Sequence, residues 1–330
     1  MAELTRLDDA EVRALARGFR LGGVSAWGEV PAGTINSNYW LEAGGRRWFL
    51  RVNEGKTEDD VRWESALVAA LVAAGVPTPP PALTEEGAPL VLHRDRWVSV
   101  FPWIAGVHRE RGEVSEDDAA LVGAALAQLH RAAAPLARTM PRAGIYTTAH
   151  IAGRFARLRS DPEAAADPQL AGALAAVGEE LAWLDERRAE REAAPGGIIH
   201  GDLFRDNVLF AAGGARLVAL LDFEQASSGA WVYDLAVCLN AWCFAGSLSP
   251  ALVRSMVGGY AAVRALEPAE RALLPVEVRA AAMRFTVTRI TDVYCRGLSQ
   301  PDKDFRRFLV RLEAWRLLGA EGLAGWLGAA

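Results

Sequence analysis

Cysteine and lysine are both scarce in this sequence. Its 330 residues include 3 cysteines, Cys238, Cys243 and Cys295, and no two of them form a Cys-x-x-Cys pair. The sequence therefore offers neither a disulfide framework nor the ligand spacing of a zinc site, and we expect a reducing compartment, the cytoplasm. Lysine occurs only as Lys56 and Lys303, whereas arginine is abundant. A site that needs a cation must therefore draw on these two lysines or on arginine.

Long apolar runs and an excess of positive charge are also lacking. No uncharged apolar stretch approaches the roughly 18 residues of a membrane-spanning helix, and the first residues are acidic where a secretory signal would be basic and then apolar. The formal net charge is -5, which does not favour binding to nucleic acid or to an anionic membrane. We therefore expect neither of these partners, and the composition leaves the oligomeric state open.

The sequence pattern predicts an α+β protein with two lobes. At 51% hydrophobic and 23% charged residues, the chain has ample material for a core. The segment PWIAG marks the predicted boundary between an N-terminal lobe, residues 1–104, and a C-terminal lobe, residues 105–330. The first lobe is expected to hold an antiparallel sheet, and the second to be mostly helical.

Periodicity and turn residues place the main elements. In the first lobe they predict a helix at 4–20, strands over 24–53 around a Gly44-Gly45 turn, a helix from Thr57 to Gly75 and a second strand pair before the boundary. In the second lobe they predict a helix after Ser115, a surface link between helices at 161–169, and short strands at 197–200, 207–211 and 216–222.

Polar residues interrupt an apolar, strand-like run, IIHGDLFRDNVLF, at residues 198–210. A strand that only filled a core would not spend positions on Asp202, Asp206 and Asn207, because a buried carboxylate without a partner is costly. The spacing of five residues from Asp202 to Asn207, with His200 two residues before, is that of the protein-kinase catalytic loop. We interpret His200 as a residue that fixes this loop, and Asp206 as a surface residue.

A second acid is expected soon after such a loop, at the end of a strand. The segment RLVALLD supplies Asp222 there. In kinases, an Asn and an Asp at these two places hold magnesium on the phosphates of ATP, while the first Asp accepts the proton of the acceptor hydroxyl. The alternative interpretation is a polar turn followed by an unrelated acid at the end of a strand.

These segments resemble a known family. IIHGDLFRDNVLF and LLDFEQASSGAWVYDLAVCLNAWCF are similar to the aminoglycoside phosphotransferase and choline kinase superfamily, and YDLAVCLNAWCF with MRFTVTRITD resembles its homoserine kinases. The resemblance runs from about residue 30 to about residue 295. One departure is Gly201, where protein kinases usually carry Arg.

The resemblance implies a bilobal protein-kinase-like fold and an enzyme that uses ATP and Mg²⁺. It implies Asp202 as the catalytic base, Asn207 and Asp222 as the metal ligands, and Asp234 as a structural acid that receives backbone hydrogen bonds from the catalytic loop. The implied reaction is phosphorylation of the side-chain hydroxyl of L-homoserine, a step of threonine biosynthesis. Two alternatives stay open: another small-molecule acceptor of the superfamily, and a kinase-like module that binds nucleotide without turnover.

The first lobe should carry the rest of an ATP site. A loop between two strands, PAGTINSNYWLEA, offers Gly33, Asn36, Ser37 and Asn38 to cover the phosphates, although these are also ordinary hairpin residues. On the third strand, Arg51 stands where kinases carry a phosphate-binding lysine, and its guanidinium is bulkier and fork-shaped.

Two further predictions complete the nucleotide site. Glu64 is the expected partner of Arg51 on the following helix, with Glu58 as the other candidate and a solvated acid as the alternative. Main-chain groups of about Phe101 to Trp103 are expected to bind adenine, although we favour a core position for the Trp103 side chain.

The acceptor site needs a cation for a carboxylate and an acid or carbonyl for an amine. Asn240, Arg284 or Arg289, and Asp292 are the candidates that the sequence offers. Arg289 and Asp292 are three residues apart, so a plain intrahelical ion pair is the alternative.

Overall fold

The protein divides into two compact units. The computed structural model describes residues 4–31, 36–214, 216–298 and 300–328. Unit 1 comprises Met1–Val107, Leu209–Gly213 and Val218–Glu224, and unit 2 comprises His108–Val208, Gly214–Leu217 and Gln225–Ala330. The sequence prediction placed the boundary after residue 104 and assigned every later residue to the second lobe.

Two later segments of the chain belong to unit 1 because they bond to it. Val107 and Phe210 form an antiparallel bridge with two backbone hydrogen bonds of 2.9 Å, and Leu220 N donates to Pro77 O at 2.7 Å. Such pairings join residues far apart in the sequence, so no local pattern around residues 209–224 predicts them. They place Asp222 in unit 1, far along the chain from its other residues.

Unit 1 is built around an antiparallel sheet of five strands in the order β1-β2-β3-β5-β4. Its elements are α1 (Asp9–Gly18), β1 (Val24–Glu29), β2 (Ser37–Ala43), β3 (Arg46–Asn53), α2 (Glu58–Ala73), β4 (Val91–His93) and β5 (Arg96–Pro102). The strands β7 (Val208–Phe210) and β8 (Leu217–Leu220) form a separate pair. The predicted turn at Gly44-Gly45 is confirmed, with φ of 58° and 74°, values that glycine adopts readily.

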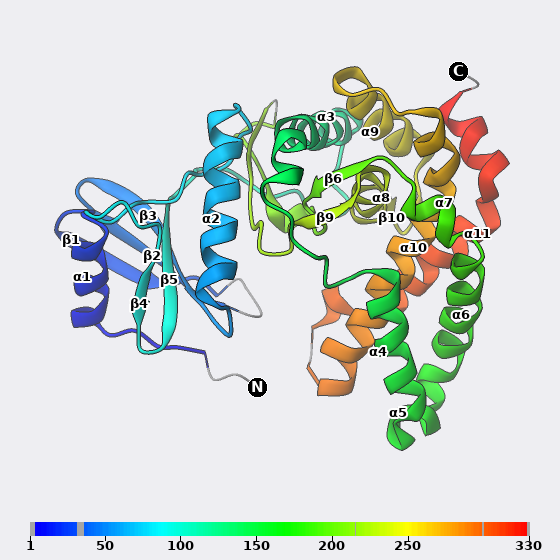
Figure 1. The fold of residues 1–330 in the computed structure, drawn as a ribbon, viewed down its shortest axis with the longest axis horizontal. Helices are drawn as coiled ribbons and strands as arrows, with labels where there is room; N and C mark the ends of the chain where they lie inside the picture. Colours follow the sequence, from blue (N-terminus) through cyan, green and yellow to red (C-terminus); the bar gives the residue numbers. More distant parts are fainter. Residues whose placement is uncertain (1–3, 32–35, 215, 299, 329–330) are drawn as a thin grey trace. The chain divides into compact units, whose positions relative to one another are not determined.

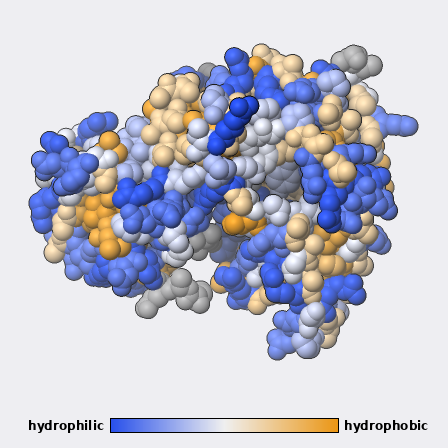
Figure 2. Space-filling model, viewed as in Figure 1, coloured by the Kyte–Doolittle hydropathy of each residue, from blue (hydrophilic) through white to orange (hydrophobic). Residues whose placement is uncertain are grey.

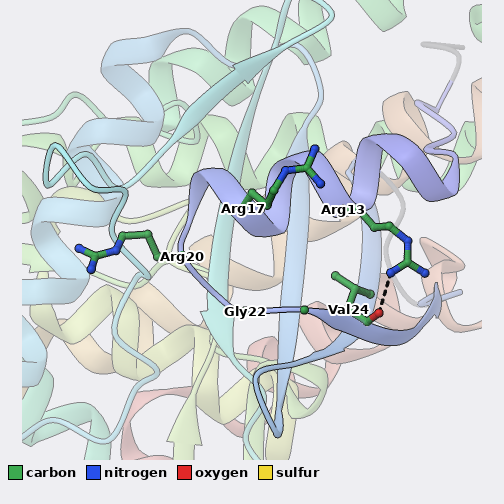
Figure 3. Close-up of a pocket in the computed structure, with 6 residues that line it drawn as sticks. Arg13, Arg17, Arg20, Gly22 and Val24 are labelled. Atoms are coloured by element: carbon green, nitrogen blue, oxygen red, sulfur yellow. Dashed lines mark hydrogen bonds between the residues drawn. The ribbon is translucent and has the colours of Figure 1, made fainter.

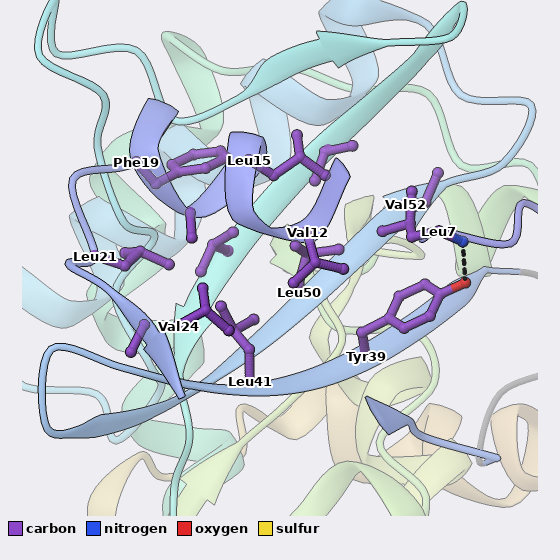
Figure 4. Close-up of a cluster of buried hydrophobic side chains, with 14 residues drawn as sticks. Leu7, Val12, Leu15, Phe19, Leu21, Val24, Tyr39, Leu41, Leu50 and Val52 are labelled. Carbon is purple, nitrogen blue, oxygen red and sulfur yellow. Dashed lines mark hydrogen bonds between the residues drawn. The ribbon is translucent and has the colours of Figure 1, made fainter. Parts of the chain in front are cut away.

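The alternation of β3 decides what lies on each face of this sheet. Leu50 and Val52 are fully buried in an apolar cluster with Val12, Leu15 and other residues of α1 (Figure 4). Because successive side chains of a strand point to opposite faces, Arg51 lies on the other face. There it meets α2, as its bond to Glu64 shows.

The first helix is shorter than predicted, because it begins at Asp9 rather than at residue 4. The Asp8 side chain accepts a hydrogen bond from Glu11 N, and the Glu11 side chain accepts one from Asp8 N, so this capping box fixes the start. Leu4 lies outside the helix and is 49% exposed, whereas Leu7 is buried and donates its N–H to the Tyr39 hydroxyl at 3.1 Å.

Unit 2 is mainly helical, which confirms the α+β class with a helical second part. Its longer helices are α3 (Glu116–Ala133), α4 (Thr148–Ser160), α6 (Pro168–Asp185), α8 (Trp231–Trp242), α9 (Pro250–Val263), α10 (Pro268–Asp292) and α11 (Arg306–Leu327). Two short helices, α5 (Pro162–Ala166) and α7 (Arg188–Glu192), and the strands β6 (Gly196–Ile199), β9 (Ser227–Ala230), β10 (Phe244–Ala245) and β11 (Ser247–Leu248) complete it (Figure 1). Single 3₁₀ turns lie at η1 (Ala134–Arg138), η2 (Arg205–Asn207), η3 (Tyr294–Arg296) and η4 (Pro301–Lys303).

The segment 161–169 was predicted to be a link, but it contains α5 and the start of α6. Each helix starts at an Asp-Pro step: Asp161 and Asp167 cap backbone N–H groups, and the prolines that follow occupy the first helical positions. Proline suits this position because the missing N–H would have no partner there.

Two helices of unit 2 cross with their backbones in direct contact. A Cβ atom on Gly123 of α3 would lie 2.1 Å from Met256 O of α9, and a Cβ atom on Gly259 of α9 would lie 2.1 Å from Ala120 O of α3. Close approach of this kind requires glycine on both sides. It also brings His130 of α3 to the Tyr260 hydroxyl of α9, at 2.8 Å.

The face of the protein seen in Figure 2 is mostly polar. Figure 2 shows hydrophilic residues over much of the visible face, with apolar residues in small separate patches. Among the residues that the structure describes, no helix has the length and hydropathy to cross a membrane.

Candidate active site

The predicted catalytic loop follows β6 and is held by a buried acid. Asp234, which is fully buried on α8, accepts hydrogen bonds from His200 N at 2.7 Å and from Gly201 N at 2.8 Å. Gly201 has a φ of 75°, a left-handed conformation that favours glycine. This backbone explains the departure from the protein-kinase pattern at Gly201. The predicted structural role of Asp234 is confirmed.

A buried network behind the loop fixes Asp234 in turn. The His130 ring bonds through Nε2 to Asp234 at 2.9 Å and through Nδ1 to the Tyr260 hydroxyl at 2.8 Å. Burial raises the pKa of Asp234, but the hydrogen bond and charge of His130 outweigh burial and hold the pKa below its ordinary value. Burial lowers the pKa of His130. The sequence analysis did not identify His130 or Tyr260, because their contact depends on the crossing of α3 and α9.

The loop is also fixed on its two other sides. His200 is fully buried, as a loop-fixing residue should be, and its Nδ1 accepts a hydrogen bond from Asp202 N at 3.3 Å. Arg284 of α10 is 4% exposed and donates to Gly201 O at 2.7 Å. Asn207 Nδ2 donates to Asp202 O at 2.8 Å, which leaves the Asn207 side-chain oxygen as the atom to offer a cation. Asp202 is half-buried, and Asp206 is exposed as predicted.

Unit 1 carries a buried arginine between two acids. Arg51 bonds to Glu64 of α2 at 2.6 Å and to Asp222 at 3.4 Å. Burial lowers the pKa of Arg51, but the charges of Glu64 and Asp222 outweigh burial and hold the pKa above its ordinary value. The predicted Arg51–Glu64 pair is confirmed, and the other candidate, Glu58, instead pairs with Arg62 at 2.6 Å.

Asp222 has an unusual backbone conformation. Its φ is 61°, in the left-handed region that a non-glycine residue seldom adopts and that Asp and Asn tolerate best. Its side chain is 41% exposed. The buried residue Glu224, two positions on, accepts a hydrogen bond from Asn36 Nδ2 at 2.9 Å and pairs with Lys56 at 3.9 Å.

Glu224 was missed in the sequence analysis. The sequence contains one indication of it, because Lys56 is one of only two lysines. A lysine that lies half-buried, as Lys56 does, needs an acid nearby.

The predicted phosphate loop is described only in part. Gly33 lies outside the described residues. Asn36 Oδ1 accepts from Glu54 N at 3.1 Å, and Ser37 Oγ donates to Glu54 Oε1 at 2.8 Å. Both side chains are buried and bonded within unit 1, so they anchor the start of β2. Asn38 is half-buried on the same strand.

The predicted adenine segment lies at the end of β5. Phe101 is 9% exposed, with the Arg51 guanidinium 5.6 Å from its ring centroid. Trp103 is 36% exposed, so the expectation that its side chain lies in the core is wrong. The strand has ended there, and the indole contacts Arg47 at 4.4 Å instead of the interior.

Asn240, predicted in the acceptor site, has a structural position. It is fully buried, its amide donates to Ala236 O and Val278 O at 2.9 Å each, and its oxygen accepts from Trp315 at 3.0 Å. Because these bonds use its polar atoms, we leave Asn240 out of the acceptor site.

The alternative interpretation of Arg289 and Asp292, an ion pair within α10, is not found among the described residues. Asp292 bonds to Arg154 of α4 at 2.8 Å. Arg289 instead lies 4.3 Å from the Phe308 ring centroid and donates to Asp302 O at 3.0 Å. Helical spacing made the pair possible, but tertiary partners decide it.

Unit 1 also has a hollow beside its first helix. It is lined by α1 and the start of β1, where Arg13 donates to Val24 O at 2.7 Å and Arg17 and Arg20 lie nearby (Figure 3). None of the predicted site residues lines this hollow.

Comparisons with known proteins identify the family of this chain. Residues 27–272 match the model of the phosphotransferase enzyme family. A curated homoserine kinase of Methylorubrum populi is 34% identical over 334 residues, covering 99% of this chain and 100% of that protein.

Solved structures show the same fold at low identity. An aminoglycoside phosphotransferase from Alicyclobacillus acidocaldarius has a TM-score of 0.66 at 19% identity and covers 98% of this chain and 96% of its own. The amicoumacin kinase hAmiN, solved with AMP-PNP, Ca²⁺ and Ami, has a TM-score of 0.70 at 14% identity and covers 95% of both chains. The chain has the predicted protein-kinase-like fold, belongs to the phosphotransferase enzyme family and is a phosphotransferase.

Proposed function

We propose that this enzyme transfers the γ-phosphoryl group of ATP to the side-chain hydroxyl of L-homoserine, giving O-phospho-L-homoserine and ADP. The observation that carries the proposal is the similarity to a homoserine kinase, which extends over 99% of the chain. The loop that holds Asp202 and Asn207, and the buried Arg51–Glu64 pair, supply the parts that this chemistry needs.

In the proposed reaction, Asp202 orients the acceptor hydroxyl and takes its proton. The hydroxyl oxygen forms a bond to the γ-phosphorus while the bond from that phosphorus to the β,γ-bridging oxygen breaks, and ADP leaves with the electron pair. Asp234 and Arg284 act through the loop backbone, since they hold Gly201 and so the position of Asp202. Their contribution is to orient the base.

Arg51 is the proposed phosphate clamp of unit 1. A guanidinium binds phosphate oxygens in a fork, and Glu64 fixes its orientation from the side of α2. Main-chain groups around Phe101 are the proposed adenine contacts. Asn38 is a proposed residue of the loop that covers the phosphates.

Asn207 and Asp222 are the proposed ligands of Mg²⁺. Their donor atoms are the amide oxygen of Asn207 and an exposed carboxylate of Asp222, which are the hard oxygen ligands that magnesium prefers. Among the described residues, no three acids, histidines or cysteines gather as a complete metal site, which fits an ion that takes its other ligands from phosphate and water. When bound, Mg²⁺ would neutralise charge on the phosphates.

We expect Arg51→Ala to lower kcat/KM for ATP on the order of 10²-fold, because the phosphates lose a preorganised cation. Arg51→Lys should retain partial activity, since it keeps the charge without the fork. Steady-state kinetics with varied ATP measures the effect. Arg62→Ala, which removes the exposed pair with Glu58 on the same helix, is the matched control. If both Arg51 variants match the wild type, the clamp must be reassigned.

The acceptor itself is tested by product formation. L-homoserine, choline, ethanolamine, methylthioribose and kanamycin are offered separately at equal concentration with ATP and Mg²⁺, and products are identified by mass spectrometry. We expect L-homoserine to be phosphorylated fastest. Faster turnover of another compound would reject the homoserine assignment and keep the phosphotransferase. Absence of turnover would favour a module that binds nucleotide without catalysis.

A further inference from the structure

Four arginines of unit 2 come from segments that lie far apart in the sequence. Arg205 belongs to the catalytic loop, Arg289 to α10 and Arg311 to α11, and Arg111 precedes α3. We call these four residues the arginine cluster. Phe308 joins two of them, because its ring centroid lies 4.3 Å from the Arg289 guanidinium and 4.2 Å from that of Arg311.

Arg311 is the central observation. It is 2% exposed, and its Nε atom is buried with no hydrogen-bond partner among the described residues. Its guanidinium packs on the rings of Phe308 and Phe244, and no acid of the described part of the chain forms an ion pair with it. Arg284, which is also buried, donates to Gly201 O at 2.7 Å, and the half-buried Arg191 pairs with Glu277 at 2.6 Å. A buried cation without an acid beside it is costly, which points to a role for Arg311 in binding an anion.

Burial and like charge both act on the arginine cluster. Burial, together with the like charges of Arg289, Arg111 and Arg205, lowers the pKa of Arg311 to about 9. Burial also lowers the pKa of Arg289 to about 10, against the opposing charge of Asp202. Arg311 is therefore still charged at neutral pH, and the charges that lower its pKa belong to other arginines.

We propose that the arginine cluster, with Arg311 at its centre, binds the carboxylate of the acceptor amino acid. This inference rests on the proposed function. A carboxylate accepts paired hydrogen bonds from a guanidinium and supplies the missing negative charge. The Arg289 guanidinium lies 6.0 Å from the ring centroid of Phe204, two residues after Asp202, so an acceptor whose hydroxyl meets Asp202 can present its carboxylate to this cluster. The cluster would then select acceptors that carry an acid and reject polycations.

The test compares L-homoserine with 3-aminopropan-1-ol, which is homoserine without its carboxylate. We expect Arg311→Met to lower kcat/KM for L-homoserine on the order of 10- to 100-fold, mainly through KM, because a charged hydrogen bond is lost. With 3-aminopropan-1-ol, wild type and variant should be equal, and wild type should already be slow. Arg306→Met on the same helix, an exposed residue paired with Asp304, should change neither.

Stability provides a readout that separates binding from structure. Because Arg311 has no acid partner, Arg311→Met should melt no lower than the wild type without ligand. L-homoserine should raise the melting temperature of the wild type, whereas the variant should not respond. If Arg311→Met fails to fold, Arg289→Met and Arg311→Lys take its place in both measurements.

The outcomes distinguish the two proposals. An unchanged kcat/KM for L-homoserine in Arg311→Met and in Arg289→Met would overturn the carboxylate site while the proposed function stands. If the wild type phosphorylates a different hydroxy acid, such as L-threonine or glycerate, the proposed function fails. The carboxylate site is still supported if Arg311→Met loses activity towards that hydroxy acid and keeps its activity towards acceptors without a carboxylate. Turnover of only uncharged or cationic acceptors would overturn both. If inorganic phosphate raises the melting temperature and no carboxylate compound does, the cluster binds phosphate and the inference is overturned.

Discussion

Asp202→Asn should reduce kcat by about 10²- to 10⁴-fold while ATP binding survives, because a general base contributes about that much. The amide has the shape of the carboxylate but cannot take the proton of the acceptor hydroxyl. The loop should keep its form, since Asp234, His200 and Arg284 hold it through backbone atoms. Single-turnover kinetics, with calorimetry of ATP binding beside it, measures both parts of this expectation.

Asp206→Asn is the matched control for this variant. Asp206 lies four residues on in the same loop and is exposed, so its charge can be removed without touching the proposed base. Its rate should equal that of the wild type. Retention of more than about a tenth of the rate by Asp202→Asn would remove Asp202 from the role of base, given the usual contribution of such a group.

Asp234→Ala should produce the largest loss of stability. The substitution strands the N–H groups of His200 and Gly201 and one ring nitrogen of His130, all of them around a fully buried carboxylate. A buried polar group left without a partner costs about 1–3 kcal/mol. The free energy of unfolding in urea should therefore fall by several such increments, and turnover should fall with it as the loop loses its anchor.

Asp117→Ala provides the comparison, since Asp117 is an exposed acid in the first turn of α3. It should unfold within about 0.5 kcal/mol of the wild type, as surface changes usually do. If Asp234→Ala were equally stable, the network of Asp234, His130 and Tyr260 would not be what holds the loop.

Local patterns were sufficient where the chemistry itself is local. The spacing from Asp202 to Asn207 identifies the loop because a tight turn must bring both residues to one place. The Arg51–Glu64 pair was predictable because an alternating strand and a helix of 3.6 residues per turn fix which side chains face each other. The start of α2 was also predictable from local sequence, because Thr57 and Asp60 form a capping box within four residues.

Contacts set by tertiary packing were not predictable in this way. The arginine cluster joins segments separated by up to 200 positions, from Arg111 to Arg311, and no periodicity links them. Asp292 takes Arg154 as its partner rather than the neighbour at helical spacing, because α4 packs beside α10. Asn240 has the residue type of a ligand, but only the surrounding helices show that its amide is already fully bonded.

The crossing of α3 and α9 limits how this protein can change by single mutation. At Gly123 and Gly259, the smallest possible side chain would overlap a carbonyl oxygen of the opposite helix. No single substitution at either position is compatible with the present packing, so an evolutionary path through them requires the helices to separate first. Separation would carry Tyr260 away from His130, and the catalytic loop would lose its support before any residue that touches a substrate had changed. Within this one unit, the residues of the helix crossing are therefore less free to change during evolution than the residues of the acceptor site.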